Sequence, residues 1–410
     1  MLYRLEVENF GSIKSQQILD LRIGKGVPDD GERFVPIYPG SKDRVPKVIG
    51  IFGANASGKS TLLRALTFIP WFIQHSYPPQ FVPLPISSFN SDLDISRPIK
   101  LAIEFCCEIE SPSTSQKEFN FFRFEIYFKF IGGSWTVREE ILKYKSIGRS
   151  SWMRLAHRNE SGLITDSKFF QISKDYPRKI PSHSSLIPYF AHHGHPFALS
   201  LWTLSRMISS NLIYAGPGLP LLTRDSFIGQ AQVDQWLTNY FSANNSMFNN
   251  VKNELNKIDV GITDISFMEF NGGNRLQFSH SGIDRPLPWL YESNGTRTYV
   301  EVLPLILERL NAHGVTIIDE IDAAIHPSLN KEIVGRYYKQ DAGKEAQLWV
   351  AGHSVSLLQD LSKEEIVFCE KSEDGETEFY RLADVNGVKR TENFFRQYLD
   401  GAYGAIPNLG

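Results

Sequence analysis

The chain has 410 residues, in which 43 Lys and Arg are balanced by 46 Asp and Glu to give a formal net charge of −3. This length can bury a large core in two or three lobes, and the charge balance excludes nucleic-acid binding through overall positive charge alone. The three cysteines form no C-x-x-C pair, which argues against a zinc site or a disulfide framework and favours a reducing compartment. No apolar run approaches the roughly 20 residues of a membrane span. The first residues are typical of neither a signal peptide nor a transit peptide, so we expect a cytoplasmic protein with no membrane partner.

The N-terminal region is predicted to contain two strands, a loop, a buried strand and a helix. Residues 2–9 alternate between polar and apolar side chains, which is typical of a strand with two unlike faces, and a second short strand follows. The segment 24–44 is rich in Gly, Pro and charged residues and is expected to be a loop. An apolar strand over 47–52 and a helix over about 61–72 enclose the next motif.

That motif is the segment 53–60, which reads Gly-Ala-Asn-Ala-Ser-Gly-Lys-Ser and so matches the phosphate-loop pattern G-x-x-x-x-G-K-S. Its glycines let successive backbone N–H groups converge on a phosphate, and the helix start adds a positive dipole end. Lys59 is expected to reach the β- and γ-phosphates, and the Ser60 hydroxyl to ligate Mg²⁺. The sequence therefore predicts ATP and Mg²⁺ as cofactors, with these nucleotide-binding candidates: Gly53, Asn55, Gly58, Lys59, Ser60 and Thr61.

The middle of the chain carries no phosphate-site motif. Residues 99–145 alternate as three strands of an antiparallel sheet. We expect the following segment, 146–256, to be a largely helical insertion or lid, with helices over 199–210 and 226–256. The core would resume around 265–278. The predicted domains are these: 1–145, the first part of a nucleotide-binding head with its antiparallel subdomain; 146–256, the helical insertion; and 257–410, the second part of the head.

A second motif follows the apolar strand over 315–318, which ends in Asp319 and Glu320. In a phosphate-loop protein, an acidic residue at such a strand end holds Mg²⁺ directly or through water, which is the role expected for Asp319. The next carboxylate, Glu320, is expected to orient or deprotonate the attacking water. Parallel strands end at one edge of a sheet, so these carboxylates would lie near the phosphate loop.

Two further positions are candidates for contacts to the γ-phosphate. His353 follows another apolar strand, 347–350, and its ring could donate a hydrogen bond there as a second catalytic residue. Ser293 and Gly295 precede a helix whose start forms a second anion site. An ordinary helix cap is the alternative for this pair. Two anion sites in one chain indicate a nucleotide sandwiched between two subunits.

The His-rich segment 192–195 invites a metal or nuclease interpretation. No spaced pair of carboxylates accompanies it, so a polar loop is the preferred interpretation.

Taken in order, these motifs resemble the heads of ABC-type ATPases such as SMC and RecF proteins. More narrowly, the chain resembles the prokaryotic OLD-like ATPases of abortive-infection systems. The segment 7–13 is similar to their first strands, 319–327 matches their Asp-Glu-x-Asp-x-x-x-His-Pro pattern, and 398–407 is similar to their tail. The resemblance covers 1–70 and 260–410 well and the middle poorly.

This resemblance implies an α/β fold: a P-loop ABC-type head with a mixed sheet core, an antiparallel β subdomain and an inserted helical domain. It also implies an ATPase that forms a homodimer or a higher homo-oligomer around ATP. Ser293 and Gly295 of one subunit would contact the γ-phosphate on the other subunit's phosphate loop, and Asp322 would lie at the interface. The implied role is the sensor and scaffold subunit of an anti-phage defence system that controls a separate effector, a nuclease or toxin.

The chain departs from the family pattern in two places. The usual Leu-Ser-Gly-Gly-Gln signature is Glu-Ser-Asn-Gly-Thr at 292–296, and the Gln that joins the sheet to the γ-phosphate has only Gln80 as a candidate. These departures imply slow or effector-gated hydrolysis. Two alternatives stay open: a RecF-like DNA repair or maintenance ATPase that clamps nucleic acid, and an ATP-gated scaffold that does not hydrolyse ATP.

Overall fold

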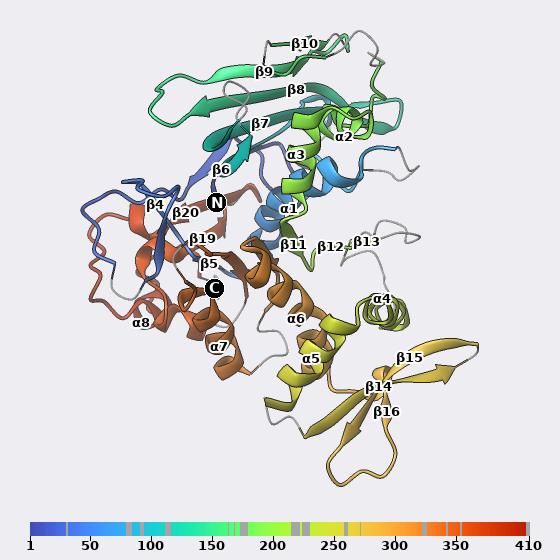
Figure 1. Ribbon diagram of the computed structural model, residues 1–410. Helices are drawn as coiled ribbons and strands as arrows, with labels where there is room; N and C mark the ends of the chain where they lie inside the picture. The colour runs from blue at the N-terminus through green and yellow to red at the C-terminus, as the bar shows by residue number, and fades with distance from the viewer. Residues whose placement is uncertain are drawn as a thin grey trace.

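The computed structural model describes most of the chain. The described residues are 1–29, 32–78, 84–90, 94–110, 116–162, 164–167, 169–172, 179–214, 222–223, 230–257, 261–270, 272–321, 326–341, 343–352 and 355–406. Two sheets organise these residues, and a helix that starts at the phosphate loop lies between them (Figure 1).

The central sheet has six strands in the order β11-β17-β18-β5-β19-β20. Neighbouring strands run parallel except for the last pair, which is antiparallel. Every residue of β5, β17 and β18 is buried, as expected of parallel strands covered on both faces. The strands are β5 (Val48–Phe52), β11 (Ile208–Ser210), β17 (Val315–Ile318), β18 (Gln347–Ala351), β19 (Ile366–Lys371) and β20 (Thr377–Arg381).

The second sheet has seven antiparallel strands in the order β10-β9-β8-β7-β6-β1-β2. Its strands are β1 (Leu2–Glu8), β2 (Gln17–Asp20), β6 (Ile99–Glu110), β7 (Lys117–Ile131), β8 (Ser134–Ser146), β9 (Met153–Arg158) and β10 (Ile164–Asp166). Apolar and polar side chains alternate along its strands. The apolar side chains form one face, which packs in the core, and ion pairs lie on the other face. The prediction of a mixed sheet core with an antiparallel subdomain is confirmed.

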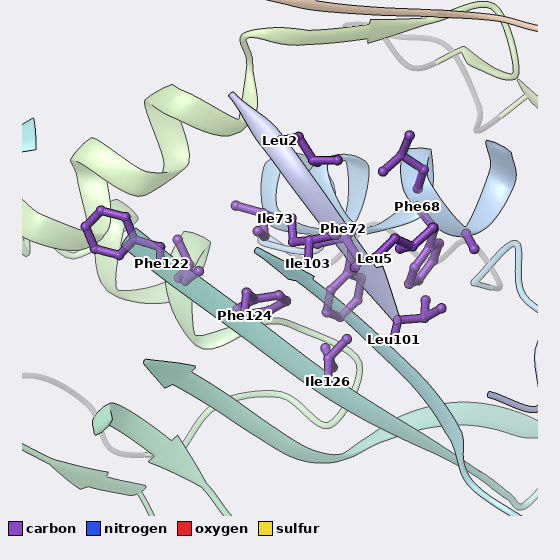
Figure 2. Close-up of a cluster of buried hydrophobic side chains, with 14 of the residues drawn as sticks. Leu2, Leu5, Phe68, Phe72, Ile73, Leu101, Ile103, Phe122, Phe124 and Ile126 are labelled. Atoms are coloured by element: carbon purple, nitrogen blue, oxygen red, sulfur yellow. The ribbon is translucent and has the colours of Figure 1, made fainter. Parts of the chain in front are cut away.

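Helix α1 (Lys59–His75) fills the space between the two sheets (Figures 1 and 2). Its side chains Phe68, Phe72 and Ile73 are buried in one cluster with Leu101 and Phe124 of the antiparallel sheet. Helices α2 (Leu186–His192) and α3 (Pro196–Ser205) extend the same layer. The phosphate-loop helix is therefore held on both sides by apolar packing, which fixes its start relative to the central sheet.

A second cluster of buried side chains joins the central sheet to a second lobe. This lobe contains α4 (Gln230–Ala243), α5 (Asn245–Lys257) and a separate sheet of β14 (Ile262–Phe270), β15 (Gly273–His280) and β16 (Leu287–Pro288). In Figure 1 this three-stranded sheet lies at the opposite end of the molecule from the seven-stranded sheet. Helices α6 (Asn294–Ala312) and α7 (Pro327–Tyr338) connect the lobe with the central sheet, and α8 (Phe394–Leu399) packs near the C-terminus.

Several segments differ from what the sequence pattern indicated. The segment 146–256 is not one helical unit, because β9 and β10 extend the seven-stranded sheet and β11 joins the central sheet. Residues 208–210, expected at a helix end, are extended because they pair with β17. Residues 265–278 belong to the separate small sheet and not to the central core. The expected loop 24–44 includes β3 (Phe34–Pro36) and the first residue of β4 (Arg44–Pro46). The domain limits at residues 145 and 256 stay predictions.

Within the described part of the chain, none of the helices combines the length and the apolar character that crossing a membrane requires.

Candidate nucleotide site

The phosphate loop joins the end of β5 to the start of α1, in the strand–loop–helix context that the motif requires. Both of its glycines have positive φ, +150° at Gly53 and +102° at Gly58. A Cβ on Gly53 would lie 2.1 Å from the Cys369 carbonyl oxygen, and one on Gly58 would lie 2.2 Å from Thr377 Oγ1. Neither position has room for a side chain, so both backbone conformation and packing require glycine.

The side chain of Lys59 folds back onto the phosphate loop and contacts its backbone. Its Nζ donates hydrogen bonds to the carbonyl oxygens of Gly53 at 2.8 Å and Ala54 at 2.9 Å, and the residue is buried. Asn55 is exposed at the tip of the loop, and Ser60 is half-buried at the helix start. Among the described residues, the buried Ser57 hydroxyl has no hydrogen-bond partner. A loop with a cation at its centre and an unsatisfied buried hydroxyl fits the phosphates of a nucleotide.

Residues far away in the sequence hold the loop from outside. The Thr377 hydroxyl on β20 lies 3.0 Å from the Ser57 carbonyl oxygen and 2.7 Å from Ser12 Oγ. Ser12 Oγ in turn donates to Thr61 Oγ1 at 3.0 Å, so the expected nucleotide ligand Thr61 already has a structural partner. The Ala54 amide donates to the carbonyl oxygen of Ala405, in the C-terminal segment, at 3.0 Å. No motif in the sequence indicates these supporting contacts.

The carboxylates after β17 lie at the same edge of the central sheet as the phosphate loop. Strand β18 separates β17 from β5, and the three strands run parallel. Asp319 is buried, and its Oδ1 accepts a hydrogen bond from the Glu320 amide at 3.1 Å. Glu320 has a φ of +52°, a left-handed conformation that is uncommon for a residue with a side chain. Such backbone conformations cluster at functional sites, where surrounding contacts enforce them.

One residue that enforces this geometry was missed in the sequence analysis. Asn211 follows β11, and its side chain pairs with both backbone polar groups of Asp319. Nδ2 donates to the Asp319 carbonyl oxygen at 3.0 Å, and Oδ1 accepts from the Asp319 amide at 2.8 Å. No local signal marks this residue, because the preceding residues 207–210 read Met-Ile-Ser-Ser and the sequence pattern predicts a helix there.

The predicted second anion site has the geometry of a helix cap. Ser293 is the N-cap of α6, and its hydroxyl accepts a hydrogen bond from the Thr296 amide at 3.1 Å. Ser293 is nevertheless exposed, and Gly295 is half-buried. Ser293 therefore acts as an ordinary helix cap. The N-terminal end of α6 is still open to solvent, so an anion could reach it.

Three expected positions lie outside the described residues: Asp322, His353 and Gln80. The strand that precedes His353, β18, ends at Ala351, and its neighbours are the strands that lead to the phosphate loop and to Asp319.

The histidine segment is structural where it is described. His195 is buried, its Nδ1 accepts from the Ala198 amide as the N-cap of α3, and burial lowers its pKa. The Nδ1 of His193 donates a hydrogen bond to the Tyr189 carbonyl oxygen at 2.8 Å. Across the residues that the structure describes, no group of three or more His, Cys, Asp or Glu is arranged to hold a metal ion.

A phosphate loop between a parallel strand and a helix, beside a strand that ends in two carboxylates, defines a P-loop nucleotide-binding protein. Residues 4–260, more than half of the chain, match the family described as "AAA domain". The chain therefore belongs to this family of P-loop ATPase domains, whose phosphate loop is a site for ATP and Mg²⁺. Residues 209–359 match a second family, described as "AAA domain, putative AbiEii toxin, Type IV TA system".

No curated protein matches the sequence. Among solved structures, the chain is similar to an SMC head bound to the C-winged helix domain of ScpA, at 15% identity over 92% of this chain and 96% of that chain, with a TM-score of 0.45. It is also similar to the SMC head domain from Thermotoga maritima, at 12% identity over 93% of this chain and 98% of that chain, with a TM-score of 0.35.

Proposed function

We propose that the chain is a cytoplasmic ABC-type ATPase that binds ATP and Mg²⁺, hydrolyses ATP between two copies of itself, and acts as the sensor and scaffold of an anti-phage defence system. The single observation that carries the ATPase assignment is the placement of Glu320 and the phosphate loop at one edge of the central sheet, with β18 between their strands. A nucleophile activated by Glu320 would then be near the phosphates that Lys59 binds.

Each residue of the site has a defined task in this proposal. The amides of the phosphate loop and Lys59 bind the phosphates, so Lys59 must exchange its carbonyl partners for phosphate oxygens. Ser60 and Asp319 would hold the Mg²⁺ ion, which neutralises phosphate charge when bound. Glu320 orients the water and accepts its proton, and Asn211 fixes the backbone from which both carboxylates project. His353, two residues after the end of the adjacent strand in the sequence, is proposed to donate a hydrogen bond to the γ-phosphate.

The two-copy arrangement is supported by the second lobe. Ser293 and Gly295 start α6 directly after the small sheet, and the Ser293 hydroxyl is exposed to solvent. Large apolar side chains are exposed just before it, with Leu290 at 53% and Tyr291 at 76% of their maximum. We propose that this corner binds the γ-phosphate on the phosphate loop of a second copy, with Asp322 at the same interface.

The defence role is supported by the family match of residues 209–359, whose description names a toxin of a type IV toxin–antitoxin system. We propose that the ATP-bound dimer holds or releases a separate effector, a nuclease or toxin. The rival DNA clamp gains no support from the charged face of the seven-stranded sheet. There Arg123 pairs with Glu6 and Glu104, both at 2.7 Å, so its charge is already neutralised.

A mixing experiment tests the shared site. Ser293→Asp keeps a good N-cap but places a negative charge where the phosphate would bind, so it should abolish turnover. Ser293→Asn, an equally good cap without the charge, is the matched control and should retain most activity. Lys59→Ala should also be inactive. Mixing the Lys59→Ala and Ser293→Asp proteins should restore part of the ATPase rate, because each mixed pair contains one intact site. If the mixture stays as inactive as its parts, the shared site is wrong.

A cell-based experiment tests the defence role. Cells that carry this gene with its neighbouring genes should survive phage challenge, and Lys59→Ala should remove that protection. If the variant protects cells as well as the parent does, the defence role does not depend on ATP binding and this part of the proposal is wrong. ATPase activity that rises with added duplex DNA and falls with salt would favour the DNA clamp instead.

A further inference from the structure

A largely apolar cavity of about 170 Å³ lies between the seven-stranded sheet, α1, α3 and the starts of β11 and β17. Figure 2 shows part of its wall, where Ile73 of α1 lies near Ile103 and Phe124 of the sheet. The wall also includes Leu204 of α3, Ile208 of β11 and Val315 of β17. The nucleotide site is at the other ends of β11 and β17, so this cavity is a separate feature of the fold.

Polar groups in the wall have partners within the protein. The Met1 ammonium donates to the Cys106 carbonyl oxygen at 2.8 Å. The Ser205 hydroxyl donates to the Trp202 carbonyl oxygen at 2.7 Å. The thiols of Cys106 and Cys107 stay neutral, because burial raises their pKa to about 11 and about 12. His313 is exposed and can be hydrated. A ligand that fits this wall is therefore neutral and apolar. Engineered apolar cavities of about 150 Å³ stay dry and bind benzene or xenon, which sets the scale of a suitable molecule.

Three elements connect the cavity with the nucleotide site. Helix α1 contributes Ile73 to the wall and begins at Lys59. Strand β11 contributes Ile208 and ends just before Asn211, and strand β17 contributes Val315 and ends just before Asp319. The Asn211–Asp319 hydrogen bonds join the two strands at their far ends. A shift of any of these elements at the cavity would therefore move a residue of the phosphate or carboxylate site.

We propose that this cavity is an effector site for one small, neutral, apolar molecule, such as a single aromatic ring or a short alkyl chain, and that its occupancy changes the affinity or turnover of ATP. The inference that a ligand binds depends only on the shape and lining of the cavity. The expected effect on turnover depends also on the proposed ATPase function. The ligand stabilises the arrangement of α1, β11 and β17 that fits it, and ATP responds by linkage between the two sites.

The experiment uses the full chain and fluorobenzene as the probe. Binding is followed by ¹⁹F NMR and by the melting temperature, which should rise with probe concentration as linkage requires. Leu204→Trp fills the cavity from α3, which carries no nucleotide residue, and should abolish binding. Leu201→Phe, also in the cavity wall on α3, provides a second filled variant if the first does not fold. Leu199→Trp is the matched control, because Leu199 lies on the same helix and is exposed.

In the parent protein, saturating fluorobenzene should change either ATP affinity or turnover by about fivefold or more, and the filled variants should show no such change. Absence of probe binding to the parent, or equal binding to a folded Leu204→Trp variant, would overturn the proposal. Binding without any effect on ATP would overturn the link between the sites. If the parent binds ATP but does not hydrolyse it, the proposed ATPase function fails, and the change in ATP affinity still decides the effector site.

Discussion

Asn211 and Asp319 lie 108 residues apart in the sequence, yet one side chain satisfies both backbone polar groups of the other residue. Both residues are buried, so neither backbone group can turn to water. Asp319 thus leaves its strand in one fixed direction, and Glu320 follows in a left-handed conformation. The edge strand β11 therefore orients the backbone of Asp319 and Glu320 as well as completing the sheet.

Replacing Asn211 by Ala should lower turnover more than ATP affinity, because the phosphate loop is untouched while the carboxylates lose their fixed direction. The two unpaired backbone groups should also cost stability, with each buried unsatisfied group worth about 1–3 kcal/mol. Steady-state kinetics and chemical denaturation measure the two effects. Asn211→Asp is the informative companion: its side chain cannot donate to the Asp319 carbonyl oxygen and adds a charge beside Asp319. Parent-like turnover in both variants would show that Asn211 does not position the site.

Lys59→Ala should abolish nucleotide binding, because it removes the cation that we propose neutralises the β- and γ-phosphates. Titration with a fluorescent ATP analogue measures the affinity. Lys257→Ala provides a matched control, since this lysine is exposed in the other lobe and pairs only with Glu254 among the contacts described. An ATP affinity equal to that of the parent in Lys59→Ala would refute the nucleotide site itself.

Thr377→Val should weaken ATP binding without unfolding the protein. The substitution keeps the shape of the side chain and removes the hydroxyl that lies between Ser57 and Ser12. Loss of one hydrogen bond costs about 1 kcal/mol. If that cost falls on the ATP-binding conformation of the loop, the affinity for ATP should be roughly fivefold weaker. Isothermal titration calorimetry of the two proteins compares the affinities. Identical affinities would mean that the loop keeps its shape without β20.

Glu140 provides a test of buried electrostatics. The carboxyl group is fully buried, and burial raises its pKa to about 7, although it accepts hydrogen bonds from the Ser185 hydroxyl and the Leu186 amide. Between its unfolded pKa, near 4.5, and about 7 the folded state binds more protons than the unfolded state. Stability from this group is therefore present below pH 4.5 and is lost as the pH rises to 7.

Glu140→Gln should therefore become more stable relative to the parent as the pH rises from about 5 to about 8, by up to about 3 kcal/mol. Urea denaturation at several pH values gives the difference in the free energy of unfolding. The comparison with the parent cancels the contribution of other titrating groups. A difference that does not change with pH would show that Glu140 titrates near its ordinary value.

The sequence was informative where a function depends on a continuous segment. The phosphate loop, with its strand and helix, is one such segment, and so is the strand that ends at Asp319 and Glu320. Their position at one sheet edge follows from the rule for parallel strands, and the order of β5, β18 and β17 agrees with it. The alternating pattern over residues 99–145 also predicted the antiparallel strands correctly.

Contacts between distant segments could not be predicted from local patterns. Residues 208–210 are extended because they pair with β17, and that pairing brings Asn211 to Asp319. Thr377 and Ala405 support the phosphate loop from the C-terminal region. Thr377 belongs to no motif, and the family-like segment 398–407 that contains Ala405 gives no sign of this contact. Strands β9 and β10 lie within the segment 146–256 that the sequence predicts to be largely helical, and they are extended because they pair in order onto β8.

The measurement that tests the ATP-dependent dimer most directly is light scattering of Glu320→Gln with saturating ATP and Mg²⁺. The substitution removes the carboxylate that we propose activates water and leaves the phosphate loop intact, so ATP should persist and the protein should have the mass of a dimer. The double variant with Lys59→Ala should stay monomeric under the same conditions. A Glu320→Gln protein that binds ATP but remains a monomer would contradict the proposal that two copies close over the nucleotide.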